Sequence, residues 1–158
     1  MLDEPGILTV PAQTAAVVHI TVPRADIRAV MGPGYRELME VVASQGLAPA
    51  GPWFTRHLRM DPELFDFEIG VPLAAPVAPS GRVRPGSLPA ARVVRTIYHG
   101  PYEGLPAAWG EFDAWIRDRR LPTEAGLWER YLTGPESNPD SSRWRTELTR
   151  PLAAPDSG

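Results

Sequence analysis

A weak internal repeat is the feature of this sequence that most limits its possible folds. The letters Ala-Gly-Pro-Trp at 50–53 return as Ala-Gly-Leu-Trp at 125–128, and the Glu, Pro and Leu of segment 68–73 return in segment 147–152. The predicted elements also repeat in one order: strand, helix, strand, strand. One copy alone could not cover its apolar helix and sheet faces, so we expect the two copies to pack together with a ligand groove between them.

The first copy is predicted over residues 15–73, after an N-terminal extension at 1–14. Its expected elements are a strand at 15–22, a helix over 27–45, and a hairpin of strands at 53–59 and 64–71. Within the helical pattern, the run Gly32-Pro33-Gly34 predicts a break, because proline and glycine disfavour a helix interior. We therefore expect a short helix followed by a longer one.

The second copy is predicted over residues 92–152, after a proline-rich connector at 74–91. Its expected elements are a strand at 92–99, an amphipathic helix over 105–119, and strands at 127–133 and 144–149. Residues 153–158 are predicted to be a disordered tail. The predicted fold class is α+β, a tandem of duplicated βαββ units in one integrated domain.

Composition excludes several functional classes. The chain has 158 residues, of which 43% are hydrophobic, so a real core is expected. All 16 basic residues are arginine, which removes Schiff-base chemistry, covalent pyridoxal phosphate and a Walker-A lysine. The absence of cysteine removes disulfides and thiolate chemistry. A net charge of −3 without a basic patch argues against nucleic acid as a direct partner.

Targeting signals and cofactor motifs are also absent from the sequence. No apolar run is long enough for a membrane span and the N-terminus does not resemble a signal peptide, so we expect a cytoplasmic protein that does not engage membranes. His19, His57 and His99 fall in separate predicted strands without metal-ligand spacing, and no serine stands in a G-x-S-x-G context. We expect neither a metal nor a cofactor.

The segment 128–132, Trp-Glu-Arg-Tyr-Leu, is the most informative strand. Alternation places Glu129 and Tyr131 on one face, and Trp128, Arg130 and Leu132 on the other. A carboxylate beside a phenol is functional if this face lines the groove. The alternative is a solvated sheet face on which Glu129 pairs with an arginine.

Two further aromatic residues are candidates for the same site. Tyr102 follows a Gly-Pro turn at the entrance of the second helix, and Trp109 lies on that helix. Either could serve only for packing, because aromatic residues at helical spacing usually belong to a core. A groove with several tryptophans and one carboxylate would suit a planar, lipophilic, cationic ligand, through stacking and cation–π contacts.

Six segments in this order resemble the GyrI-like small-molecule-binding family, which also occurs as the effector-binding domain of AraC- and MerR-type regulators. They are Phe65–Leu73, Leu88–Ala90, His99–Leu105, and Trp128–Leu132 followed by Arg145–Glu147 and Pro151–Leu152. The resemblance spans almost the whole chain and implies the family's duplicated βαββ (SHV2) fold. The chain departs from the family in reading Thr133-Gly134-Pro135 where Thr-Asp-Pro is usual, and in showing no preceding helix-turn-helix segment.

The resemblance also implies site residues. Glu129 would be the acidic residue of an aromatic-walled pocket for cationic lipophilic compounds, with Tyr131, Tyr102 and Trp109 lining it. Phe54 and Glu68 of the first copy are further ligand-binding candidates. If the chain is an enzyme, Glu129, Tyr131 and Tyr102 are its catalytic candidates.

Three functions stay open at this point. The leading hypothesis is a monomeric, stand-alone binding protein for lipophilic aromatic or cationic compounds, with a role in drug or toxin resistance. The second is a hydrolase that opens the cyclopropane of genotoxic compounds, as some relatives do, with Glu129 as general base. The third is a gyrase-inhibitor-like binder of a macromolecule, for which Arg117, Arg119 and Arg120 form the one compact charged candidate.

Overall fold

Each predicted copy forms an antiparallel sheet with one helix against it. The computed structural model describes residues 2–60, 62–135 and 137–153. It divides into unit 1, from the described residues of 1–10 and 91–158, and unit 2, residues 11–90. The predicted α+β fold is confirmed.

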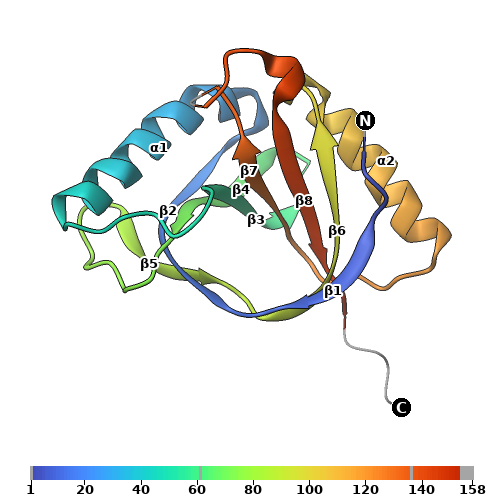
Figure 1. Cartoon of the computed structure of the whole chain (residues 1–158), viewed down its shortest axis with the longest axis horizontal. Helices are drawn as coiled ribbons and strands as arrows, with labels where there is room; N and C mark the ends of the chain where they lie inside the picture. Colours follow the sequence, from blue (N-terminus) through green and yellow to red (C-terminus); the bar gives the residue numbers. More distant parts are fainter. Residues whose placement is uncertain (1, 61, 136, 154–158) are drawn as a thin grey trace. The chain divides into compact units, whose positions relative to one another are not determined.

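Unit 2 contains the first helix and has the strand order β3-β4-β2-β5. Its elements are β2 (Gln13–Pro23), η1 (Arg24–Asp26), α1 (Ile27–Ser44), β3 (Phe54–Met60), β4 (Leu64–Pro72) and β5 (Val83–Leu88). In Figure 1, α1 runs beside β2 and β4 of its own unit.

Unit 1 contains the second helix and has the strand order β1-β6-β8-β7. Its elements are β1 (Gly6–Val10), β6 (Ala91–His99), η2 (Tyr102–Gly104), α2 (Leu105–Asp118), β7 (Leu127–Thr133), η3 (Ser141–Arg143) and β8 (Arg145–Pro151). The helix α2 contacts β6, and its first turn accommodates Pro106, as predicted.

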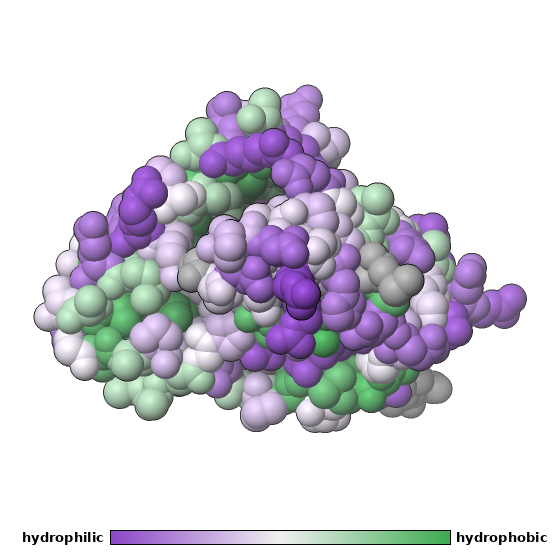
Figure 2. All heavy atoms as spheres, turned by 45° about the horizontal axis from the view of Figure 1, so that its top comes forward, coloured by the Kyte–Doolittle hydropathy of each residue, from purple (hydrophilic) through white to green (hydrophobic). Residues whose placement is uncertain are grey.

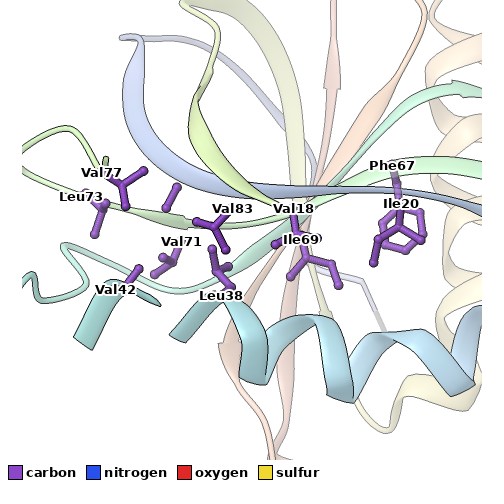
Figure 3. Close-up of a cluster of buried hydrophobic side chains, with 11 residues drawn as sticks. Val18, Ile20, Leu38, Val42, Phe67, Ile69, Val71, Leu73, Val77 and Val83 are labelled. Carbon is purple, nitrogen blue, oxygen red and sulfur yellow. The ribbon is translucent and has the colours of Figure 1, made fainter. Parts of the chain in front are cut away.

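The core of unit 2 lies between α1 and one face of its sheet. Figure 3 shows Leu38 and Val42 of α1 directed toward the strand residues Val18, Ile69 and Val71. All five are at most 1% exposed. Alternate residues of each strand meet the apolar stripe of the helix, which is why strand and helix periodicities in the sequence indicated one buried layer.

The core of unit 1 has the same construction with larger side chains. Phe112 and Ile116 of α2 pack with Val94 and Tyr98 of β6 and with Leu148 of β8. Phe112 and Leu148 have no exposed surface. The two units therefore each bury one helix face on one sheet face.

The predicted break in the first helix is wrong. A single helix runs over Ile27–Ser44 with Pro33 inside it. Proline removes one backbone donor, but the carbonyl this leaves unpaired is that of the exposed Ala29 and can be solvated. Gly34 is buried, and a Cβ there would meet Ile69 at 2.6 Å, so close packing on the sheet keeps the helix continuous.

Two segments expected to lack regular structure form edge strands. β1 lies in the predicted N-terminal extension and pairs with β6 of unit 1, and β5 lies in the predicted connector and pairs with β2 of unit 2. Each strand ends at a similar turn, Val10-Pro11-Ala12 or Leu88-Pro89-Ala90. Prolines and exposed side chains hid these strands from sequence analysis, because edge strands tolerate both. The predicted tail lies outside the described residues except for Ala153.

The surface is mixed in character. The face drawn in Figure 2 shows hydrophobic patches among hydrophilic residues. In the described part of the chain, the large apolar side chains classed as exposed are Ile7 and Leu8 of β1. No described helix combines the length and the hydropathy that crossing a membrane would need.

An imidazole lies in the aromatic part of the unit 2 core. The His57 ring stacks on Phe67 at 5.3 Å between centroids and meets Phe65 edge-on at 5.4 Å. Burial, with a smaller effect of the Arg24 charge, lowers the pKa of His57 from 6.5 to about 4. The folded protein therefore holds this imidazole neutral under conditions where an unfolded chain would begin to protonate it.

This depressed pKa predicts a loss of stability in acid. Between pH 6.5 and pH 4, His57 is protonated in the unfolded chain but stays neutral in the folded protein. The free energy of unfolding should therefore fall by about 3 kcal/mol over that interval. Urea unfolding at pH 7 and pH 4 measures the change. His57→Phe keeps a stacked ring without a titrating group and should lose this part of the pH dependence. Equal pH dependence in the two proteins would contradict the prediction.

Candidate functional site

Glu129 lies on β7, on the sheet face that packs against α2. It stands opposite Leu148 of β8, a member of the core beneath the helix. Glu129 is 8% exposed, so the alternative of a solvated face is wrong. Strand alternation puts the neighbouring Arg130 on the other face, where it pairs with Glu147 at 3.0 Å.

Two neutral donors hold the Glu129 carboxylate. The Trp109 indole Nε1–H donates to Oε2 at 2.6 Å, and the Tyr131 hydroxyl donates to Oε1 at 2.7 Å. Hydrogen bonds to an ionised acceptor are stronger than those between neutral groups. Because both donors are uncharged, they fix the carboxylate in place without cancelling its charge.

Further aromatic rings continue from Tyr131. Tyr102 of η2 lies edge-on to Tyr131 at 5.8 Å between centroids and contacts Trp144 at 4.8 Å. On the other side of the carboxylate, Trp109 packs against Phe112 at 5.7 Å. Glu129 is thus one acidic group within a set of aromatic side chains that all belong to unit 1.

Trp144 belongs to this set of rings, although no sequence pattern indicated it as a site residue. Its indole Nε1–H donates to the Asn138 carbonyl at 2.7 Å, and its own carbonyl accepts from the Gly100 backbone N–H at 2.9 Å. These bonds tie the segment between β7 and β8 to the turn that carries Tyr102. Its sequence signal, a tryptophan at the start of a predicted strand, was not separable from ordinary core packing.

The His99–Gly104 turn places Tyr102 for a steric reason. Gly100 has φ 141°, which favours glycine. The Tyr98 hydroxyl donates to the Pro101 carbonyl at 2.8 Å, and a Cβ at Gly104 would collide with that hydroxyl. The two glycines therefore let the turn close over Tyr98 and direct the chain into α2.

Four of the predicted site residues lie together within unit 1. Glu129, Tyr131, Tyr102 and Trp109 form one cluster in unit 1.

The other two, Phe54 and Glu68, belong to unit 2. Phe54 is 1% exposed and lies so close to Gly70 that a Cβ there would strike its ring. Glu68 lies 4.0 Å from Arg56, and burial raises its pKa. Their ligand-binding role stays a prediction.

The three arginines proposed above for a macromolecular partner lie at the end of α2. The Arg119 guanidinium lies over the Trp115 ring at 3.7 Å from the centroid. This contact is a cation–π interaction within the helix surface. Arg117 and Arg120 are exposed.

Nothing in the described ranges resembles a metal site. No group of three or more His, Asp or Glu side chains among residues 2–60, 62–135 and 137–153 is arranged to hold an ion. The chemistry that the described unit 1 cluster offers is that of a fixed negative charge, hydroxyl and indole groups, and aromatic faces. Such a set can bind a lipophilic cation or orient a water molecule.

Comparison with known proteins gives a family match. The sequence model of the GyrI-like small-molecule-binding domain matches residues 3–153. No curated protein sequence matches the chain.

Solved structures share the fold at low sequence identity. The EcmrR C-terminal domain is 21% identical, with a TM-score of 0.82, over 95% of this chain and 97% of that one. SAV2435 bound to tetraphenylphosphonium is 15% identical, with a TM-score of 0.71, over 96% and 95%. A hydrolase from Listeria innocua is 13% identical, with a TM-score of 0.65, over 95% and 92%. The chain spans 57% of EcmrR in its complex with DNA.

The hydrogen bond from Tyr131 should contribute measurably to stability. Tyr131→Phe leaves Oε1 of a buried carboxylate without this donor, so the free energy of unfolding should fall by about 1–3 kcal/mol. Urea denaturation measures this loss. The control is a double-mutant cycle with Glu129→Gln, in which Tyr131→Phe should lower the free energy of unfolding by less than it does in the unaltered protein. Additive costs would show that the two side chains are not coupled.

Proposed function

Because the chain belongs to the GyrI-like family of small-molecule-binding domains, we propose that unit 1 binds a lipophilic, aromatic, monocationic compound beside Glu129. The observation that carries the proposal is the buried carboxylate held by two neutral donors. Burial of a charged carboxylate costs free energy, whereas an apolar residue at such a position would not have this cost. A ligand cation beside the carboxylate would offset part of this cost.

The surrounding rings support the same ligand class. Tyr131, Tyr102, Trp109 and Trp144 offer aromatic faces within one cluster. A cation is attracted to such faces by their quadrupole, by up to about 2 kcal/mol when it is desolvated. The Glu129 charge would repel an anion, while a neutral compound would gain no attraction from that charge.

A structural neighbour offers a precedent for the ligand. SAV2435 is described bound to tetraphenylphosphonium, which is a cation with four aromatic rings. Its identity to this chain is low, so the precedent supports the ligand class and not particular contacts. Tetraphenylphosphonium is accordingly a suitable first probe.

Tetraphenylphosphonium should bind and quench tryptophan fluorescence, because Trp109 touches the carboxylate. Glu129→Gln keeps the size of the side chain and removes its charge, so the affinity should fall by roughly thirtyfold, equivalent to about 2 kcal/mol. Fluorescence titration measures both proteins.

The matched control is Glu103→Gln, which removes an exposed carboxylate from η2, next to Tyr102. The affinity of this variant for tetraphenylphosphonium should stay within about twofold of that of the unaltered protein, since exposed charges are screened. A loss as large as that of Glu129→Gln would mean that only general attraction is being measured. Equal affinity in all three proteins would remove Glu129 from the site.

A second candidate function is hydrolysis, and the pairing of Glu129 with Tyr131 favours it. Glu129 could take a proton from water as the water oxygen bonds to a cyclopropane carbon. The broken ring bond's electrons would then pass to a conjugated carbonyl oxygen, which becomes a phenolate and is protonated. Tyr131 already donates to Glu129, so Tyr102 is the phenol suited to that oxygen. The Listeria innocua neighbour described as a hydrolase adds to this candidate.

Turnover separates the two functions. A cyclopropane-bearing spirocyclohexadienone is incubated with the protein, and the hydrated, ring-opened product is followed by mass spectrometry. If Glu129 is a general base, Glu129→Gln should lower the rate by about 10²–10⁴-fold. Binding in a one-to-one ratio without product, or an equal rate in the variant, excludes this hydrolase mechanism and leaves the binding function.

A further inference from the structure

Unit 2 contains a position that corresponds to the Glu129 site of unit 1. The helix residues Leu38 and Val42 in the unit 2 core correspond to Phe112 and Ile116 in the unit 1 core. The cross-strand pair of Arg56 with Glu68 likewise corresponds to that of Arg130 with Glu147. These two matches define which residues of the units are equivalent, and they shift the repeat seen in the letters 50–53 and 125–128 by one residue.

Smaller details agree with this equivalence. The register of β3 with β4 shifts after His57, and that of β7 with β8 shifts after Tyr131. The Ala50 N–H donates to the Pro72 carbonyl at 2.8 Å, and the Glu124 N–H donates to the Pro151 carbonyl at 2.9 Å. The two hairpins therefore share one backbone design, down to a bulge and a terminal contact.

The equivalent side chains differ in their chemistry. Thr55 takes the place of Glu129 and is 1% exposed, so unit 2 has no carboxylate at this position. His57 takes the place of Tyr131. On the helix, Tyr35 takes the place of Trp109, and its ring lies 4.7 Å from that of Trp53.

A positive charge lies beside this position. Arg24 begins η1 as Tyr102 begins η2, and its guanidinium lies over the Phe65 ring at 4.4 Å. The Arg24 charge also helps to lower the pKa of His57. Arg24 therefore contributes a positive potential at the imidazole, whereas the corresponding place in unit 1 has the negative charge of Glu129.

The imidazole of His57 also has unused hydrogen-bonding capacity. Its contacts are the aromatic ones with Phe65 and Phe67. Within residues 2–60, 62–135 and 137–153, no hydrogen bond or ion pair engages its ring nitrogens. A half-buried polar group of this kind needs water or a ligand as its partner.

We propose that this part of unit 2 is a second ligand site, one that takes a flat aromatic carboxylate. Tyr35 and Trp53 would stack on the ring system, and Arg24 and the N–H of His57 would bind the carboxylate. Arg24 can do so while keeping its present contacts, because a guanidinium has five donors. The site selects anions where the unit 1 site selects cations, and it does not depend on the function proposed for unit 1.

The test uses 2-naphthoate at pH 7.5, with the signals of the three histidine rings followed by NMR. His57 is assigned through the His57→Phe variant. Saturable displacement of the His57 signal, with those of His19 and His99 unmoved, is the expected result. Displacement of all three signals together, or of none, would overturn the proposal.

Titration calorimetry of variants then tests whether the Arg24 charge contributes to 2-naphthoate binding. Arg24→Gln should weaken 2-naphthoate binding by about tenfold or more, and His57→Phe by several-fold. Arg28→Gln, which removes an exposed arginine nearby on α1, should leave the affinity within about twofold. Equal losses for Arg24→Gln and Arg28→Gln would show non-specific attraction and overturn the proposal.

A matched cationic probe completes the test. The 2-naphthylmethylammonium ion has the same rings with the opposite charge and should not displace the His57 signal. If it does so as well as 2-naphthoate, the site is not selective for anions. If Glu129→Gln changes 2-naphthoate affinity more than Arg24→Gln does, the compound binds in unit 1. Either outcome would contradict the assignment.

Discussion

Burial of one helix face on one sheet face is the interaction on which each unit depends. In unit 2 the stripe of Leu38 and Val42 covers the strands, and in unit 1 Phe112 and Ile116 do so. This layer fixes which strand residues point toward the helix. It therefore decides that Glu129, and not its neighbour Arg130, is buried beside α2, since adjacent strand residues face opposite ways. The site's chemistry follows from that register.

A buried carboxylate is costly unless its oxygens are satisfied, and this cost explains the residues around Glu129. Trp109 and Tyr131 each supply one donor and otherwise present apolar ring surface. An arginine partner would satisfy the same oxygens but would neutralise the charge, as Arg130 does for Glu147 on the opposite face. Neutral aromatic donors are thus the arrangement that keeps both burial and charge, as the proposed binding of a lipophilic cation requires.

Local patterns in the sequence predicted the helices, the central strands and the shared face of Glu129 and Tyr131, because these depend on periodicity. They failed where tertiary packing overrides local preference. Pro33 stays helical because Gly34 packs against Ile69. The edge strands β1 and β5 were missed because their side chains are largely exposed. Trp144 joins the site through hydrogen bonds that have no sequence signature.

Duplication offers a physical reason for the difference between the units. A repeated βαββ backbone repeats the positions of side chains but leaves their identity free, provided that the helix and sheet faces stay apolar. At the position beside the helix, unit 1 has a carboxylate with a phenol, and unit 2 has Thr55 with the imidazole of His57. A neutral imidazole stacked on Phe67 is compatible with the nearby charge of Arg24, whereas a protonated one would be repelled by it. Exchange of the charged group at one position thus changes the electrostatic preference of a unit without changing its fold.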